Sequence, residues 1–260
     1  MQTYNKKFNI KHFLIIIIIL AIVLAITLSI SKFTFKKDYS PPTALAVLLP
    51  RYRVINMDAI SVKTDFDRDG ISDQKDILQG AKIQLNNPAK NIFKDGNNET
   101  NYFNGGDPPA EIAICTDIIA RAFKGAGFDL RQLVNDDIAG NFDSYPLKIN
   151  WGQTRTDKNI DYRRIQNTEI FFKRTGRSMI AVFDFSDIKN LEQWLPGDIV
   201  FFDMDRDGYT DNTGIVSDFT TRKGIPKIIY NYIDPGFTIE RDILGTSSIK
   251  GHYRYPKNPF

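Results

Sequence analysis

The sequence predicts an α+β fold. The helices come first along the chain, the strands of an antiparallel sheet follow, and the helices pack on that sheet. Apolar residues recur at helical spacing between residues 112 and 126. After residue 196, short apolar segments alternate with turn residues, as in consecutive strands. Helices followed by a run of strands are typical of the α+β class. An uncharged stretch near the N-terminus adds a single transmembrane helix before this domain.

That stretch, residues 13–30, consists mostly of Ile and Leu and lacks Gly and Pro. An apolar helix of about 20 residues crosses a ~30 Å hydrocarbon core, whereas the apolar part of a signal peptide has about 7–15 residues. We therefore expect an uncleaved anchor, although Ser29-Ile30-Ser31 leaves a cleaved signal peptide open. A short tail before one span usually stays in the cytoplasm, so the rest is expected in the periplasm or at the cell surface. The expected organisation is a tail (1–12), an anchor (13–30), a linker (31–57) and one domain (58–260).

The positive charge of the chain comes from the flanks of the expected anchor. The chain has 34 basic and 31 acidic residues, a net charge of +3. Six of the basic residues are lysines on either side of residues 13–30, and without them the balance becomes 28 to 31. An acidic domain gives no reason to expect nucleic-acid binding.

The regular elements of the domain follow from periodicity and turn residues. Gly125 and Gly127 end the helical pattern that starts at residue 112. Pro196-Gly197-Asp198 is a turn signal directly before the most apolar strand segment. The expected helices cover 75–85, 112–126, 130–138 and 168–175, and the expected strands cover 199–202, 213–218, 227–232 and 251–255.

Two acidic loops have the spacing of EF-hand-type calcium loops. Acidic loop 1 (residues 65–76) has acids at positions 1, 3, 5, 9 and 12 and Gly70 at position 6, where the chain turns sharply. Acidic loop 2 (residues 203–214) repeats this pattern, but its twelfth residue is Gly214. The alternative is a pair of solvated turns rich in Asp and Gly. The candidate Ca²⁺ ligands are Asp65, Asp67, Asp69, Ile71 through its carbonyl, Asp73 and Asp76, and in loop 2 Asp203, Asp205, Asp207, Tyr209 and Asp211.

Cys115 is the only cysteine, so an exported domain has no intramolecular disulfide. It stands at the expected start of an amphipathic helix, where the helix dipole lowers a thiol pKa and favours the nucleophilic thiolate. The plainer interpretation is a small buried core residue.

Several motifs carry a resemblance over about residues 60–256. They are Cys115-Thr116-Asp117, Arg121-Ala122-Phe123, Asp129-Leu130 through Asp137-Ile138, Asn159-Ile160-Asp161-Tyr162-Arg163-Arg164, Phe171-Phe172-Lys173-Arg174, Pro196-Gly197-Asp198-Ile199-Val200, Gly214-Ile215-Val216-Ser217-Asp218 and Gly251-His252-Tyr253-Arg254-Tyr255. In this order they closely resemble the bacterial domain-of-unknown-function family 1287, which belongs with the NlpC-like, papain-fold cysteine hydrolases. The resemblance implies a papain-like fold, a nucleophilic Cys115 and action on the peptide stems of peptidoglycan. It also implies a histidine base, oriented by a polar residue on the next strand.

The sequence departs from that pattern at the residue that should act as the general base. The family's histidine position holds Asn212, and a neutral amide cannot act as a general base. The next strand reads Tyr230-Asn231, of which Asn231 could orient an imidazole. His252 belongs to the terminal Gly-His-Tyr-Arg motif, where packing is the favoured role and a substitute base the alternative.

Arg163 and Arg164 are candidates for binding a substrate carboxylate. The favoured alternative is an ion pair with a neighbouring acid such as Asp161 or Asp198.

Two functions follow from these patterns. The first is a membrane-anchored, extracytoplasmic cysteine peptidase or amidase that acts on cell-wall peptides. The second is a catalytically silent relative that binds wall peptide or a protein partner. Cys115 and its flanks favour the first, whereas Asn212 favours the second.

Overall fold

The computed structural model describes residues 55–59, 63–92 and 101–257. The chain separates into two units, Met1–Pro41 and Pro42–Phe260, and every described residue belongs to the second. The expected tail and anchor, and most of the linker, lie outside the described residues. Within the described part of the chain, no helix has both the length and the apolar character needed to span a bilayer.

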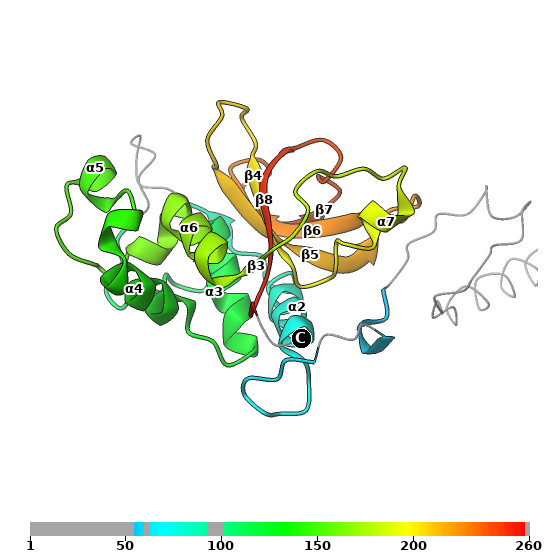
Figure 1. Cartoon of the computed structure of the whole chain (residues 1–260), viewed down its shortest axis with the longest axis horizontal. Coiled ribbons are helices and arrows are strands. Elements are labelled where there is room, and N and C mark those ends of the chain that lie inside the picture. The colour runs from blue at the N-terminus through cyan, green and yellow to red at the C-terminus, as the bar shows by residue number, and fades with distance from the viewer. Residues whose placement is uncertain (1–54, 60–62, 93–100, 258–260) are drawn as a thin grey trace, which may run out of the picture. The chain divides into compact units, whose positions relative to one another are not determined.

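The predicted α+β class is confirmed, because the helices precede a six-stranded antiparallel sheet with strand order β3-β8-β4-β5-β6-β7 (Figure 1). A separate two-stranded parallel sheet joins β1 and β2. The α-helices are α2 (Asp73–Ile83), α3 (Cys115–Gly125), α4 (Leu130–Gly140), α5 (Leu147–Trp151), α6 (Ile165–Thr175) and α7 (Ile188–Leu191). The 3-10 helices are η1 (Met57–Ala59), η2 (Phe142–Ser144) and η3 (Asp161–Arg163). The strands are β1 (Lys90–Asn91), β2 (Ile112–Ala113), β3 (Arg177–Ser178), β4 (Ile199–Asp203), β5 (Asn212–Thr220), β6 (Pro226–Asn231), β7 (Thr238–Arg241) and β8 (Ser248–Arg254).

Helix α3 is the central helix of the domain and packs against both α2 and strand β5. Ile118, Ile119 and Phe123 on this helix are completely buried. Burial of each such side chain contributes about 1.5–3 kcal/mol relative to exposure. Helices α2 and α3 approach closely at Gly80, where a Cβ atom would lie 2.6 Å from the carbonyl oxygen of Ala122. This packing holds the first residue of α3, Cys115, in a fixed place.

The two faces of the sheet belong to different apolar clusters. Ile199 and Ile215 belong to the main cluster, which also contains the buried residues of α3, α4 and α6. Val200 and Val216 belong to a second cluster with Trp194 on the opposite face. Strand β4 is therefore buried on both sides, which explains why its sequence is continuously apolar instead of alternating.

The structure adds elements that the sequence patterns did not indicate, and it moves some boundaries. Helices α5 and α7 have five and four residues, too few for a periodic signal. Strand β7 has four residues and only one of them is buried, so it lacks an apolar run. Helix α6 starts three residues before the expected range and β8 starts at Ser248 instead of 251.

Candidate functional site

Cys115 is the first residue of α3, and its side chain is almost completely buried. The preceding residue, Ile114, is in an extended conformation and caps the helix. Its N–H donates a 2.9 Å hydrogen bond to Oδ2 of Asp117, which satisfies one of the unpaired amides at the helix start. The helix therefore begins at the cysteine itself, and not at residue 112 where the expected range started, because Ile112 and Ala113 form β2.

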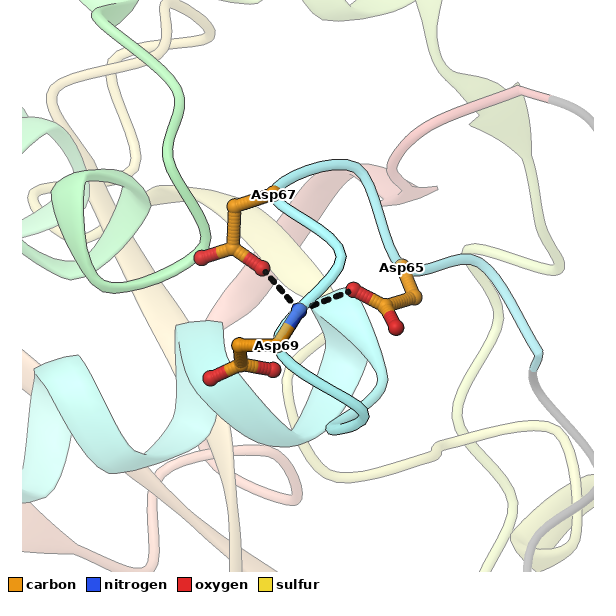
Figure 2. Close-up of side chains that lie close together, drawn as sticks. All are labelled: Asp65, Asp67 and Asp69. Atoms are coloured by element: carbon orange, nitrogen blue, oxygen red, sulfur yellow. Dashed lines mark hydrogen bonds between the residues drawn. The ribbon is translucent and has the colours of Figure 1, made fainter.

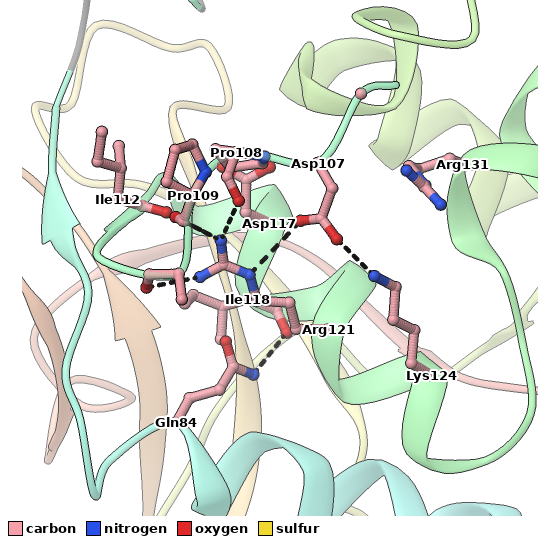
Figure 3. A network of polar contacts seen from close by, with 12 residues as sticks. Gln84, Asp107, Pro108, Pro109, Ile112, Asp117, Ile118, Arg121, Lys124 and Arg131 are labelled. Atoms are coloured by element: carbon pink, nitrogen blue, oxygen red, sulfur yellow. Dashed lines mark hydrogen bonds and ion pairs between the residues drawn. The ribbon is translucent and has the colours of Figure 1, made fainter. Parts of the chain in front are cut away.

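Arg121 fixes the segment that leads into this helix (Figure 3). One of its terminal nitrogens donates to the carbonyl oxygens of Pro108 and Pro109 at 3.2 Å and of Ile112 at 2.9 Å. Asp107, at the start of the segment, forms a 2.5 Å ion pair with Lys124 of α3. The segment that leads to Cys115 is thus held by hydrogen bonds and an ion pair to α3, the helix that starts at Cys115. No sequence pattern distinguished this role of Arg121.

A cavity of about 470 Å³ opens beside Cys115. This volume lies within the range of small-molecule sites. Its lining residues come from the start of α3, from the stretch between the end of α5 and the first turn of α6, from acidic loop 2 and from the chain after β6. They are Ile114, Cys115, Asn150, Trp151, Ile160, Arg163, Arg164, Ile165, Gln166, Asp205, Asp207, Tyr209, Thr210, Asp211, Tyr232 and Ile233.

The environment of Cys115 raises the pKa of its thiol. Burial is the main cause that raises the pKa of Cys115, to about 12, and the charges of Asp117 and Asp211 raise it further. The backbone N–H groups of Thr213 and Thr116 interact with the sulfur and act in the opposite direction. The helix start was expected to favour thiolate, but desolvation of the charged form outweighs the amide dipoles here.

Asp211 and Tyr232 form a hydrogen-bonded pair in the cavity wall. The Tyr232 hydroxyl donates a 2.9 Å hydrogen bond to Oδ2 of Asp211. Asp211 also accepts the N–H groups of Met204 at 2.9 Å and Asp205 at 3.2 Å. Burial nevertheless raises the pKa of Asp211. Tyr232 was not among the residues that the sequence indicated, and it lies directly after the end of β6.

Asn212, at the histidine position of the implied pattern, is the first residue of β5 and is completely buried. Its Oδ1 accepts the N–H of Thr213 at 2.8 Å, the same amide that interacts with the Cys115 sulfur. Its Nδ2 has no hydrogen-bond partner. Asn212 therefore lies close to the thiol, but it does not line the cavity and supplies no base.

His252 lies in a buried polar cluster and does not line the cavity. Its Nε2 is 2.9 Å from Oδ2 of Asp198, and its Nδ1 is 2.8 Å from the carbonyl oxygen of Ile180. The imidazole stacks on Trp194, with ring centroids 4.0 Å apart. The other histidine, His12, is outside the described residues, so no histidine in the described part of the chain lines the cavity.

The side chains of Tyr230 and Asn231 interact with residues other than Cys115. Tyr230 is buried in the second apolar cluster, where its hydroxyl interacts with Arg241. The Nδ2 atom of Asn231 donates to the carbonyl oxygen of Ala89 at 2.9 Å, and its Oδ1 accepts Nδ2 of Asn91 at 2.6 Å. Neither side chain lines the cavity that contains Cys115.

Arg163 and Arg164 both form ion pairs with acidic side chains. The sequence favoured this role over binding of a substrate carboxylate. The Arg163 guanidinium binds both carboxylate oxygens of Asp117, each at 2.9 Å, in a completely buried pair. Its partner is thus neither Asp161 nor Asp198. Arg164 pairs with Asp161 at 3.1 Å and lies over the ring of Trp151 at 4.1 Å in the cavity wall.

Comparison with known proteins places these features in a family. The domain of unknown function DUF1287 matches residues 79–255, which include Cys115, acidic loop 2 and His252. The chain belongs to the DUF1287 family. A relative in Escherichia coli (strain K12), described as the uncharacterized protein YijF, is 36% identical over 179 residues, which cover 69% of this chain and 80% of YijF. No solved structure matches the chain.

Acidic loop 1 precedes the residues that match DUF1287, whereas acidic loop 2 connects β4 to β5 within them. In loop 1, carboxylate oxygens of Asp65, Asp67 and Asp69 all lie within 4.8 Å of one another. The first two accept the N–H of Asp69, at 3.1 and 3.3 Å (Figure 2). The corresponding oxygens of Asp203, Asp205 and Asp207 in loop 2 are equally close.

The two loops share most of their internal hydrogen bonds, although each also has one that the other lacks. The glycine N–H at position 6 donates to Oδ2 of position 1, at 3.0 Å in loop 1 and 3.1 Å in loop 2. The N–H of position 7 donates to Oδ1 of position 5, at 2.7 and 2.8 Å. The N–H of position 2 donates to Oδ1 of position 9, at 2.9 Å in both loops. In both loops, carboxylates therefore face backbone N–H groups of their own loop.

Proposed function

We propose that this DUF1287 domain is an NlpC-like, papain-type relative that binds a cell-wall peptide in the Cys115 cavity and does not cleave it by a cysteine–histidine mechanism. The supporting observation is the burial of His252 against Asp198, with both ring nitrogens engaged. With no imidazole of the described residues beside it, a buried thiol of raised pKa stays protonated near neutral pH. The order of a cysteine helix followed by an antiparallel sheet supports the papain-type assignment.

The lining of the cavity suits a peptide that has both a free amine and a carboxylate. Asp205 and Asp207 provide negative charge for an ammonium group. Arg164 provides positive charge and is held over Trp151. Cell-wall stem peptides carry both kinds of group. Ile233, which is 63% exposed, and the 72% exposed Tyr209 add apolar surface for a peptide backbone.

We further propose that residues 13–30 anchor this domain outside the cytoplasmic membrane. The support is the uncharged length of that segment, with a short tail before it. An extracytoplasmic position would bring the cavity to the cell wall. Labelling of single introduced cysteines in Cys115→Ala cells, with a reagent that does not cross membranes, tests this topology. Arg222→Cys, which places a cysteine at an exposed position, should be labelled. No labelling of this variant is expected if the domain is cytoplasmic.

The binding proposal is tested by sedimenting the full-length chain, purified in detergent, with insoluble peptidoglycan. We expect the chain to sediment with the wall and Arg164→Ala to reduce the bound fraction at least threefold. Arg222→Ala, which removes an exposed arginine between β5 and β6, serves as the charge-matched control and should bind like wild type. Equal binding of all three proteins would contradict a role for the cavity.

A second candidate function is hydrolysis with Asp211 in place of histidine. It is favoured by Asp211 and Tyr232, which share the cavity with the thiol and interact electrostatically with it. A carboxylate whose pKa is raised by burial is a better base than an ordinary aspartate.

Mass analysis of soluble fragments from the same incubations separates the two functions. The binding proposal expects no fragments beyond those released by the Cys115→Ala variant. Fragments that require both Cys115 and Asp211 would establish the hydrolase instead.

A further inference from the structure

We propose that acidic loop 1 is a calcium site in which the carboxylates of Asp65, Asp67, Asp69, Asp73 and Asp76 and the carbonyl of Ile71 bind one ion. The inference is independent of peptide binding in the Cys115 cavity. The loop lies before the residues that match DUF1287, so the site would be a feature of this chain outside the matched region.

A second observation supports the site in addition to the spacing of the acids. Two buried carboxylate oxygens of the loop have no hydrogen-bond partner. The side chains of Asp73 and Asp76 are 1% and 5% exposed, and Oδ2 of each has no hydrogen-bond partner. A buried carboxylate oxygen without a partner is costly, and proteins normally pair such groups or bind them to a metal. The other oxygen of Asp73 accepts the N–H of Phe66, which directs this carboxylate into the loop.

Asp73 and Asp76 both lie in the first turn of α2, directly after the other acids of the loop. Five carboxylates therefore share one short stretch of chain, where their negative charges repel one another. A divalent cation at the centre would turn this mutual repulsion into attraction.

The loop is held in shape by the rest of the domain. Phe66 stacks on Phe128, with ring centroids 4.4 Å apart. Gly127 packs so closely on Asp67 that a Cβ at Gly127 would lie 2.9 Å from the Cβ of Asp67. Gly70 has a φ of +89°, which suits glycine at the sharp turn. A site with preset geometry loses less entropy on binding an ion.

The donor set selects calcium. All six candidate groups offer oxygen and none offers nitrogen or sulfur, which favours a hard cation over zinc. Calcium accepts the variable geometry of such a loop, whereas magnesium demands a near-ideal octahedron. Asp76 is shorter than the glutamate that usually occupies position 12, so we expect weak binding. Extracellular calcium modules bind with Kd values of about 0.1–1 mM.

Acidic loop 2 provides an internal control. Gly214 stands at its twelfth position, and both oxygens of Asp211 at position 9 already accept hydrogen bonds. Loop 2 has one buried carboxylate oxygen without a partner, Oδ1 of Asp203, whereas loop 1 has two. The exposed Asp69 and Asp207 occupy position 5 of the two loops, so Asp69→Asn and Asp207→Asn remove the same charge from equivalent places.

The test is thermal unfolding of the full-length chain in detergent, first stripped with chelator and then given 10 mM calcium chloride at constant ionic strength. Binding with a Kd of about 0.1–1 mM should raise Tm by about 3–10 °C. Magnesium chloride at the same concentration should give less than a third of that shift. We expect Asp69→Asn and Asp76→Asn to lose more than half of the calcium shift and Asp207→Asn to retain it.

Several results would overturn the proposal. A wild-type Tm that does not respond to 10 mM calcium means that no site exists. An equal response to magnesium means that the ions only screen charge. A full response in Asp69→Asn and Asp76→Asn means that the response does not come from loop 1. An equal loss in Asp207→Asn means that it is not specific to loop 1, which also contradicts the proposal.

Discussion

The Nε2 atom of His252 lies 2.9 Å from Oδ2 of Asp198, and both side chains are completely inaccessible to solvent. Arg254 binds the same carboxylate, with Nε at 2.7 Å from Oδ1 and a terminal nitrogen at 2.8 Å from Oδ2. Gln74 of α2 donates a further 2.8 Å bond to Oδ1. Asp198 therefore joins the end of the sheet to α2, and His252 serves this junction instead of the thiol.

Asp198→Asn should destabilise the domain by about 3–5 kcal/mol, because it leaves the buried Arg254 charge without its partner. Denaturant unfolding at pH 7 measures the loss. Asp234→Asn is the control, because Asp234 is exposed and its change should stay within about 0.5 kcal/mol. A loss below about 1 kcal/mol for Asp198→Asn would show that the junction contributes little.

The same carboxylate predicts a pH dependence of stability. Burial acts to raise the pKa of Asp198, but hydrogen bonds from Arg254 and His252 outweigh it and lower the pKa below its ordinary value. A lowered folded-state pKa contributes stability above the unfolded pKa of about 3.9, and this contribution is lost as pH falls through the folded-state pKa. Between pH 5 and pH 3 the wild type should lose more stability than Asp198→Asn. Parallel losses in the two proteins would contradict the assignment.

These contacts mark the limit of what the sequence could predict. The Gly-His-Tyr-Arg motif placed His252 on a strand, but its partner Asp198 is 54 positions away and follows only from strand pairing. The long elements were predictable because burial imposes periodicity on α3 and a continuous apolar run on β4. Cavity residues such as Tyr232 come from segments without regular structure, where no period identifies them.

Thiol labelling of Cys115 should be slow and should rise tenfold per pH unit from pH 7 to about pH 10. With a pKa of about 12, about one thiol in 10⁴ is ionised at pH 8. Asp211→Asn removes a charge that raises this pKa, so it should increase the labelling rate at fixed pH. His252→Gln should leave the pH profile unchanged in protein that remains folded by circular dichroism. A plateau near pH 7 would reveal an activated nucleophile and oppose the proposed silent site.

Arg121→Ala should destabilise the domain by about 1–3 kcal/mol, because it releases four backbone carbonyls in the segment before α3. The looser segment should also expose Cys115 and speed its labelling without changing the slope of the pH profile. Lys124→Ala is the matched control on the same helix, because it removes only a partly exposed ion pair with Asp107. Such pairs contribute about 0–1 kcal/mol. Equal effects of the two substitutions would show that the charge of Asp107, and not the carbonyl contacts, fixes this segment.

The Asp117–Arg163 pair should show strong energetic coupling. Both side chains are completely buried, and two 2.9 Å hydrogen bonds join them below the first turn of α3. Asp117→Leu or Arg163→Met alone should cost about 3–5 kcal/mol, because each strands a buried charge. The double variant should cost less than the sum by at least about 2 kcal/mol, measured by denaturant unfolding in a double-mutant cycle. Additive losses would mean that each residue acts through other contacts, and they would reopen Arg163 as a ligand for a substrate carboxylate.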